Sequence, residues 1–188
     1  MTLLELKKYF TLIREPKMKT FLEKCLENAP GYFWDISSSS TGKYHPTWAL
    51  GKGGLVRHTA AAMYFGSELS NTFGLTVVES DVAIVALGIH DTLKYGIDYD
   101  VRYHDMHPYL PKDYYKDFKG IIGEDLYNEV MSAVSRHMGN ADSGKWNILN
   151  LQLENRIHYV VHLADYFSSR KKVNFSDFDN MVFEKYEG

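Results

Sequence analysis

Apolar residues in this chain recur at steps of three and four positions, and this spacing limits the possible fold more than any other feature. The segment LVRHTAAAMYFGSELSNTFG, which begins at Leu55, shows the pattern along its whole length. Such a step returns to the same face of an α-helix, whereas a half-buried β-strand alternates at every second residue. No segment shows convincing two-residue alternation. The sequence therefore predicts an all-α protein.

Residues that stop helices divide this pattern into segments. We expect a helix over 3–26 that is interrupted at Pro16, an irregular region over 32–54, and a helix over 55–74. A further helix is expected over 79–96, followed by a long aromatic loop with a short helix over 97–122. Two amphipathic helices are expected over 123–139 and 150–172. The length of 188 residues suits a single domain with a substantial core.

The charge balance and the cysteine content exclude several classes of protein. A net charge of −3 and a pI near 6.2 leave no overall basic footprint, so we expect no surface for duplex nucleic acid. Cys25 is the only cysteine, which fits a reducing compartment and excludes a thiolate metal cluster. The first residues do not resemble a signal peptide, and no apolar run has the length of a membrane span. We therefore expect a cytoplasmic protein that does not contact a membrane.

An apolar segment, IVALGIHDTLKYG, contains three ionisable groups close together. His90 and Asp91 are adjacent, and Lys94 follows about one helical turn later. Burying one such group costs several kcal/mol unless it is paired or binds a metal. His58 and Asp165, on neighbouring expected helices, are the natural partners for an ion held at His90 and Asp91. Imidazole and carboxylate ligands without a thiolate suit Mn, Fe, Co, Ni, Zn or Mg.

Simpler explanations exist for each of these residues taken singly. A half-buried histidine at a helix end can hydrogen-bond and compensate the helix dipole, as for His58 or His137. Asp165 can be a paired structural carboxylate, and Lys94 a solvated cation at a helix end. The i, i+4 pair His158 and His162 has metal-ligand spacing, but such pairs are common on helices. The ordered set of ligand types favours a metal site over these separate explanations.

This ordered set resembles the H…HD…D signature of the HD superfamily of metal-dependent phosphohydrolases. The segments GGLVRHT, HDTLKYG and HLADYFSSR are similar to the branch that contains 3′–5′ exoribonuclease-like proteins and HD proteins of phages and bacteria. The resemblance covers most of residues 43–172 and implies a single helical HD domain with a metal site between its core helices. Residues 1–40 lie outside the resemblance and are expected to form an N-terminal helical extension.

The resemblance also implies which residues bind the metal, one ion or two. One divalent ion would be held by the four signature residues, His58, His90, Asp91 and Asp165. A second ion would be bound by His107 and His137, with Asp91 as the bridge between the ions. His107 is preferred to His104 because HP followed by an apolar run resembles the start of an intervening helix. His162, one turn before Asp165, would orient a metal ligand.

The reaction implied is attack of metal-activated water on a phosphoester or phosphoanhydride. Asp91 and Lys94 would be the catalytic residues, since the lysine can neutralise charge that builds on the phosphoryl oxygens. Lys43 and Arg136 are candidate phosphate anchors in loops at the mouth of the site, and His45 is a third such candidate.

The acidic balance favours a nucleotide or the end of a short nucleic acid as substrate, because a processive exonuclease needs a basic track for the backbone. A homo-oligomer is possible. Two alternatives stay open: a nucleotide-binding sensor without turnover, and a di-iron oxygenase that uses the same ligand set.

Overall fold

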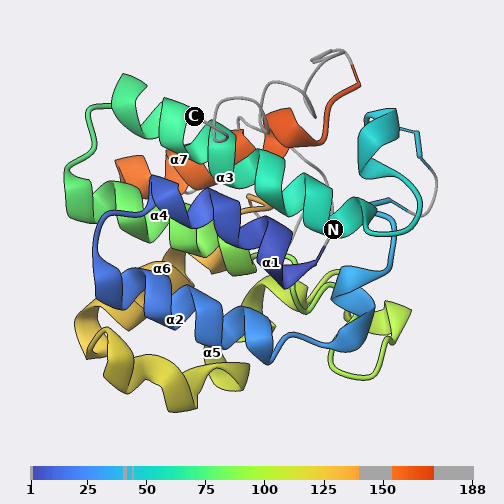
Figure 1. Ribbon diagram of the computed structural model, residues 1–188, viewed down its shortest axis with the longest axis horizontal. Helices are drawn as coiled ribbons and strands as arrows, with labels where there is room; N and C mark the ends of the chain where they lie inside the picture. Colours follow the sequence, from blue (N-terminus) through green and yellow to red (C-terminus); the bar gives the residue numbers. More distant parts are fainter. Residues whose placement is uncertain (1, 40–41, 44, 140–153, 172–188) are drawn as a thin grey trace.

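The computed structural model describes residues 2–39, 42–43, 45–139 and 154–171 of the chain, and these residues are helical with no strand (Figure 1). This confirms the all-α prediction. The α-helices are α1 (Leu3–Leu6), α2 (Pro16–Glu27), α3 (Gly54–Thr72), α4 (Val77–Ile89), α5 (Leu110–Tyr114), α6 (Glu124–Ser135) and α7 (Arg156–Ser168). The 3₁₀ helices are η1 (Lys7–Leu12), η2 (Gly31–Trp34), η3 (Thr47–Ala49), η4 (Val101–Tyr103), η5 (His107–Tyr109) and η6 (Lys116–Ile121). No helix in these ranges combines the length and the apolar character that a membrane span requires.

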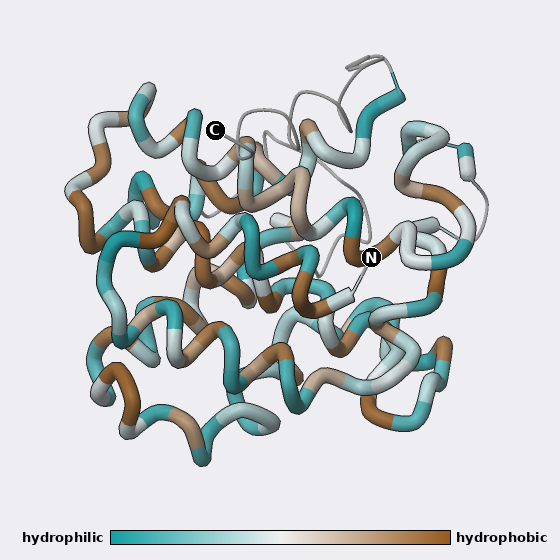
Figure 2. The backbone as a smooth tube through the Cα atoms, viewed as in Figure 1, coloured by the Kyte–Doolittle hydropathy of each residue, from teal (hydrophilic) through white to brown (hydrophobic). Residues whose placement is uncertain are grey.

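Helix α4 lies at the centre of the molecule and packs against α2, α3, α6 and α7. In Figure 1, α3 and α7 lie on one side of α4, and α2 and α5 on the other. All residues of α4 from Asp81 to Ile89 are buried. A helix with neighbours on every side must be apolar around its whole circumference, which explains the unbroken apolar run in its sequence. The surface helix α2 instead alternates between hydrophilic and hydrophobic residues along its length (Figure 2).

The expected break at Pro16 is present, and a buried carboxylate stabilises it. Pro16 is the first residue of α2, a position that needs no backbone N–H donor. The Asp81 carboxylate accepts hydrogen bonds from the backbone N–H groups of Arg14 (2.9 Å) and Glu15 (2.7 Å). Asp81 thus fixes the start of α2 against the central helix.

The end of α4 differs from the prediction, which extended this helix to Gly96. The helix ends at Ile89 because side chains take the carbonyl groups of its last turn. The Nδ1 atom of His90 donates to the carbonyl of Leu87 (2.6 Å), and the hydroxyl of Thr92 donates to the carbonyl of Ile89 (2.8 Å). The predicted helix over 90–96 is therefore wrong, and His90 and Asp91 lie at a helix terminus.

Two later helices are also shorter than predicted. Helix α6 ends at Ser135. Helix α7 begins at Arg156, where the Asn155 side chain caps it by accepting from the backbone N–H of His158 (3.0 Å). The expected helical residues 150–153 and 172 lie outside the described part of the chain.

Candidate metal centre

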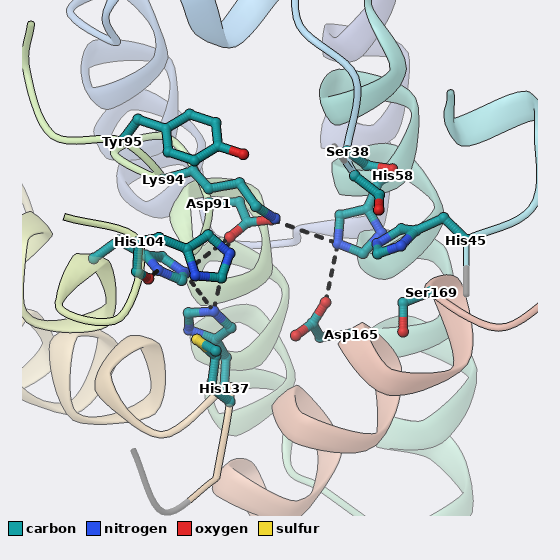
Figure 3. Close-up of a pocket in the computed structure, with 13 residues that line it drawn as sticks. Ser38, His45, His58, Asp91, Lys94, Tyr95, His104, His137, Asp165 and Ser169 are labelled. Atoms are coloured by element: carbon teal, nitrogen blue, oxygen red, sulfur yellow. Dashed lines mark hydrogen bonds and ion pairs between the residues drawn. The ribbon is translucent and has the colours of Figure 1, made fainter. Parts of the chain in front are cut away.

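The start of α3 brings His58 into the core. Gly53 adopts a left-handed conformation (φ 69°) that a glycine accepts without strain. A Cβ atom at Gly54 would lie 2.3 Å from the carbonyl oxygen of Ala49, so only glycine allows the helix to begin this close to that backbone. One turn later the His58 side chain is buried and points toward α4 and α7 (Figure 3). The backbone geometry at the start of α3 therefore explains why both positions are glycine in the GGLVRHT segment.

Two groups of buried side chains have the composition and spacing of metal-ligand sets. The first contains His58, His90 and Asp165, and the second contains Asp91, His107 and His137. Within each group, the candidate ligand atoms all lie within 4.8 Å of one another. The structure thus brings together all six residues that the sequence predicts as metal ligands, from the helices α3, α7 and η5 and from the turns that follow α4 and α6.

The first group joins α3, α7 and the end of α4. The Nε2 atom of His58 lies 2.9 Å from the Asp165 carboxylate and 3.3 Å from the Nε2 atom of His90. The same carboxylate oxygen is 3.5 Å from His90 Nε2. Three ligand atoms therefore converge on one point.

The second group joins the turn after α4, η5 and the end of α6. The Nε2 atoms of His107 and His137 are 3.1 Å apart, and His107 Nε2 is 3.0 Å from Asp91 Oδ1. His137 Nε2 lies 3.8 Å from the same oxygen. The neighbouring His104 has a half-exposed side chain that contacts Asp105 instead, so it is His107 that joins the group.

Hydrogen bonds at the other ring nitrogen orient all four histidines of these groups. The Nδ1 atoms of His90, His107 and His137 bond to the backbone carbonyls of Leu87, His104 and Val134. The Nδ1 atom of His58 contacts Ser168 Oγ (3.1 Å), whose own proton goes to the carbonyl of Asp165. Because a carbonyl oxygen can only accept, each of these Nδ1 atoms carries a proton, which leaves Nε2 as the ring nitrogen that can bind a cation. This tautomer and this outer support are typical of histidine metal ligands.

The consequence is that Nε2 atoms face one another in both groups. Two Nε2 atoms at 3.1 or 3.3 Å, each beside a carboxylate oxygen, repel one another unless a proton or a metal ion lies between them. The donor set, two imidazoles and one carboxylate in each group, fits a divalent transition metal.

Asp91 lies between the two groups. Its Oδ1 atom faces His107 and His137, while its Oδ2 atom is 3.8 Å from His58 Nε2 and 3.7 Å from His90 Nε2. The ammonium of Lys94 bonds to Oδ2 at 2.8 Å. A carboxylate with one oxygen toward each ligand group has the geometry of a bridge.

The protonation states suit metal binding. Burial alone would raise the pKa of Asp91, but Lys94, His90 and His107 hold this pKa well below its ordinary value. Burial likewise acts against ionisation of Asp165, and the nearby His58 and His90 hold its pKa well below the ordinary value. Burial lowers the pKa of His137 to about 3. Both carboxylates are therefore ionised and His137 is neutral near pH 7.

A cavity of about 190 Å³ opens onto both ligand groups (Figure 3). Lys94, Tyr95 and His104 line it on the Asp91 side. Ser38, His45 and Ser169 line it on the side of His58.

Besides the candidate ligand His90, three other predicted residues lie outside this cavity lining. Lys43 is exposed, and the guanidinium of Arg136 pairs with Glu154 at 2.5 Å. The role of these two residues as phosphate anchors remains a prediction. The Nδ1 atom of His162 donates to the backbone carbonyl of His137 (2.7 Å). His162 thus supports the main chain of His137, a candidate ligand. The ring of His137 is oriented by the carbonyl of Val134 instead.

Ser168 is a functional residue that the sequence reasoning missed. It lies three residues after Asp165 and thus on nearly the same helix face, which was the available signal. His158, in contrast, contacts Ser132 Oγ at 3.2 Å and takes no part in the cluster.

Comparison with family models, with curated proteins and with solved structures finds no match for this chain. The chemistry of the site therefore has to be inferred from its own residues.

Proposed function

We propose that this protein is a divalent-metal-dependent phosphohydrolase of the HD type, with a nucleotide or the end of a short nucleic acid as its substrate. One observation supports the proposal most strongly. Four buried histidines are held through Nδ1 and turn their Nε2 atoms toward two buried carboxylates, an arrangement that a bound divalent cation would stabilise. Bound divalent ions would lower the pKa of a water molecule toward neutrality and offset the charge of the phosphoryl oxygens.

The residues around the ligand groups suit a phosphoryl substrate. Lys94 uses one donor for Asp91 and lies in the cavity wall, where further N–H donors can contact phosphoryl oxygens. Asp91 and Asp165 counter this positive charge, so that the pKa of Lys94 stays above its ordinary value although burial acts against it. A permanent cation beside the reacting group stabilises the charge that develops there.

The size of the cavity favours a terminal phosphoryl group. Pockets that enclose a drug-sized ligand measure roughly 300–1,000 Å³, whereas this one holds about 190 Å³. It suits a phosphate with its attacking water, and the nucleoside would remain outside the cavity.

The test begins with the purified protein, stripped with a chelator and reloaded separately with Mn, Fe, Co, Ni, Zn or Mg. Ions per chain are measured by elemental analysis, and phosphate release is measured with a panel of nucleotides and short RNA and DNA. We expect metal-dependent turnover that Asp91→Ala abolishes while the helical circular dichroism spectrum stays the same. Turnover retained by Asp91→Ala would refute the metal assignment.

A di-iron oxygenase is the second candidate, because two imidazoles and one carboxylate are also the donor set of non-haem iron oxygenases. Lys94 has no evident use in that chemistry. Oxygen consumption by the iron-loaded protein, without phosphate release from any substrate of the panel, would favour the oxygenase. Nucleotide binding with neither activity would favour a sensor.

A further inference from the structure

The cavity wall beside His58 is formed partly by the loop that precedes α3. His45 lies in this loop, half-buried, and lines the cavity. Its ring packs edge-on against the ring of His58, with 5.6 Å between centroids and 65° between planes (Figure 3). His45 is therefore next to a candidate metal ligand without belonging to either ligand group.

The residues after His45 are held firmly to the helix that carries His58. The guanidinium of Arg57 donates to the carbonyls of Trp48 (2.5 Å), Leu50 (2.9 Å) and Lys52 (3.0 Å). Arg57 is adjacent to His58 in α3, so the loop and the ligand are positioned by the same turn of helix. Such fixed placement is what a residue that contacts substrate requires.

The Nδ1 atom of His45 is buried and has no hydrogen-bond partner among the described residues. A buried polar atom without a partner costs free energy, and in a native protein it calls for an explanation. Burial, together with the nearby His58 and Lys94, lowers the pKa of His45 to about 3, against the opposing effect of Asp165 and Asp91. An imidazole ring carries at least one N–H that can donate a hydrogen bond.

Two of the three serines that line the cavity use their protons elsewhere. The hydroxyl of Ser38 donates to the carbonyl of Ala49 (2.6 Å), and that of Ser169 donates to the carbonyl of Tyr166 (2.8 Å). On the opposite wall, Lys94 supplies a cation. An anion in the cavity thus has the ammonium of Lys94 on one side and the imidazole of His45 on the other.

We propose that Nδ1–H of His45 donates a hydrogen bond to a phosphoryl oxygen of the substrate and so positions the phosphate on the His58 side of the cavity. This inference rests on the proposed function and names the residue that binds the phosphate opposite Lys94. An N–H donor suits this place, because it binds an anionic oxygen.

The test measures binding, so that it is independent of turnover. Inorganic phosphate is titrated calorimetrically into Mn²⁺-loaded, desalted protein, and Mn²⁺ per chain is measured on the same samples. The variants are His45→Ala, His45→Asn, whose amide N–H can occupy the place of Nδ1–H, and His158→Asn, a control in a histidine outside the cavity. We expect His45→Ala to weaken phosphate binding about tenfold to a hundredfold. His45→Asn should recover most of this loss, and His158→Asn should bind as the wild type does.

The outcomes separate this inference from the proposed function. Unchanged phosphate affinity in His45→Ala, with Mn²⁺ content retained, overturns the role of His45 and leaves the phosphohydrolase intact. A loss of Mn²⁺ in His45→Ala also overturns it, because His45 would then be a metal ligand. Wild-type protein that binds Mn²⁺ but no phosphate overturns the proposed function itself and this inference with it.

Discussion

Because Asp91 lies between the two ligand groups, Asp91→Ala and Asp165→Ala should reduce the stabilisation by bound metal to different extents. Asp91→Ala removes the carboxylate that faces both groups, whereas Asp165→Ala removes a ligand of the first group only. At a free concentration one hundred times its Kd, each bound ion stabilises the folded protein by about 2.7 kcal/mol. Two ions give roughly 5 kcal/mol, which corresponds to a rise in Tm of about 10–20 °C for a domain of this size.

We therefore expect Mn²⁺ to raise the wild-type Tm by about 10–20 °C, that of Asp165→Ala by about half as much, and that of Asp91→Ala hardly at all. Scanning calorimetry with MnCl₂ or with chelator measures this difference within each variant, so a lower metal-free Tm does not affect it. Asp81→Ala is the matched control, since this buried aspartate of α4 caps α2 and lies outside both groups. It should lower the metal-free Tm and retain the full Mn²⁺ effect. A full rise in Asp91→Ala, or none in Asp165→Ala, would refute the two-group arrangement.

Three further predictions concern catalysis, packing and pH. Lys94→Gln should lower kcat about 10²–10³-fold with the metal content unchanged, as measured by steady-state kinetics and elemental analysis. Gly54→Ala should lower the free energy of unfolding by about 1–3 kcal/mol in urea titrations, because its Cβ would overlap the Ala49 backbone. Gly120→Ala, which meets nothing within 4 Å, should change it by less than about 0.5 kcal/mol. Burial, with Arg136, lowers the pKa of His158 from 6.5 to about 4. As the pH falls, the unfolded chain therefore protonates at this histidine before the folded protein does. The free energy of unfolding should decrease between pH 6.5 and pH 4. The stability of His158→Asn, followed over this range, should fall less steeply than that of the wild type; an equal slope would contradict the assignment.

The helices could be predicted from the sequence because helix formation depends on neighbours three and four residues apart. This accounts for the all-α fold, for the break at Pro16 and for the apolar character of the central helix. The end of α4 could not be predicted, because side-chain bonds from His90 and Thr92 take the carbonyls of a segment that otherwise has a helical pattern. Periodicity measures hydrophobicity and does not detect such competition for the backbone.

The sequence also determined which ligand types the chain offers: imidazoles and carboxylates, in an order that suggested one site. Only the tertiary structure decided how they meet. His58 Nδ1 contacts Ser168, 110 residues away in the chain, and this contact turns Nε2 toward Asp165. The same packing left Arg136 paired with Glu154 and placed His45 against His58. The physical reason is that local patterns set the period of each helix, whereas the packing of α3 and α7 on α4 sets the distances between residues that are far apart in sequence.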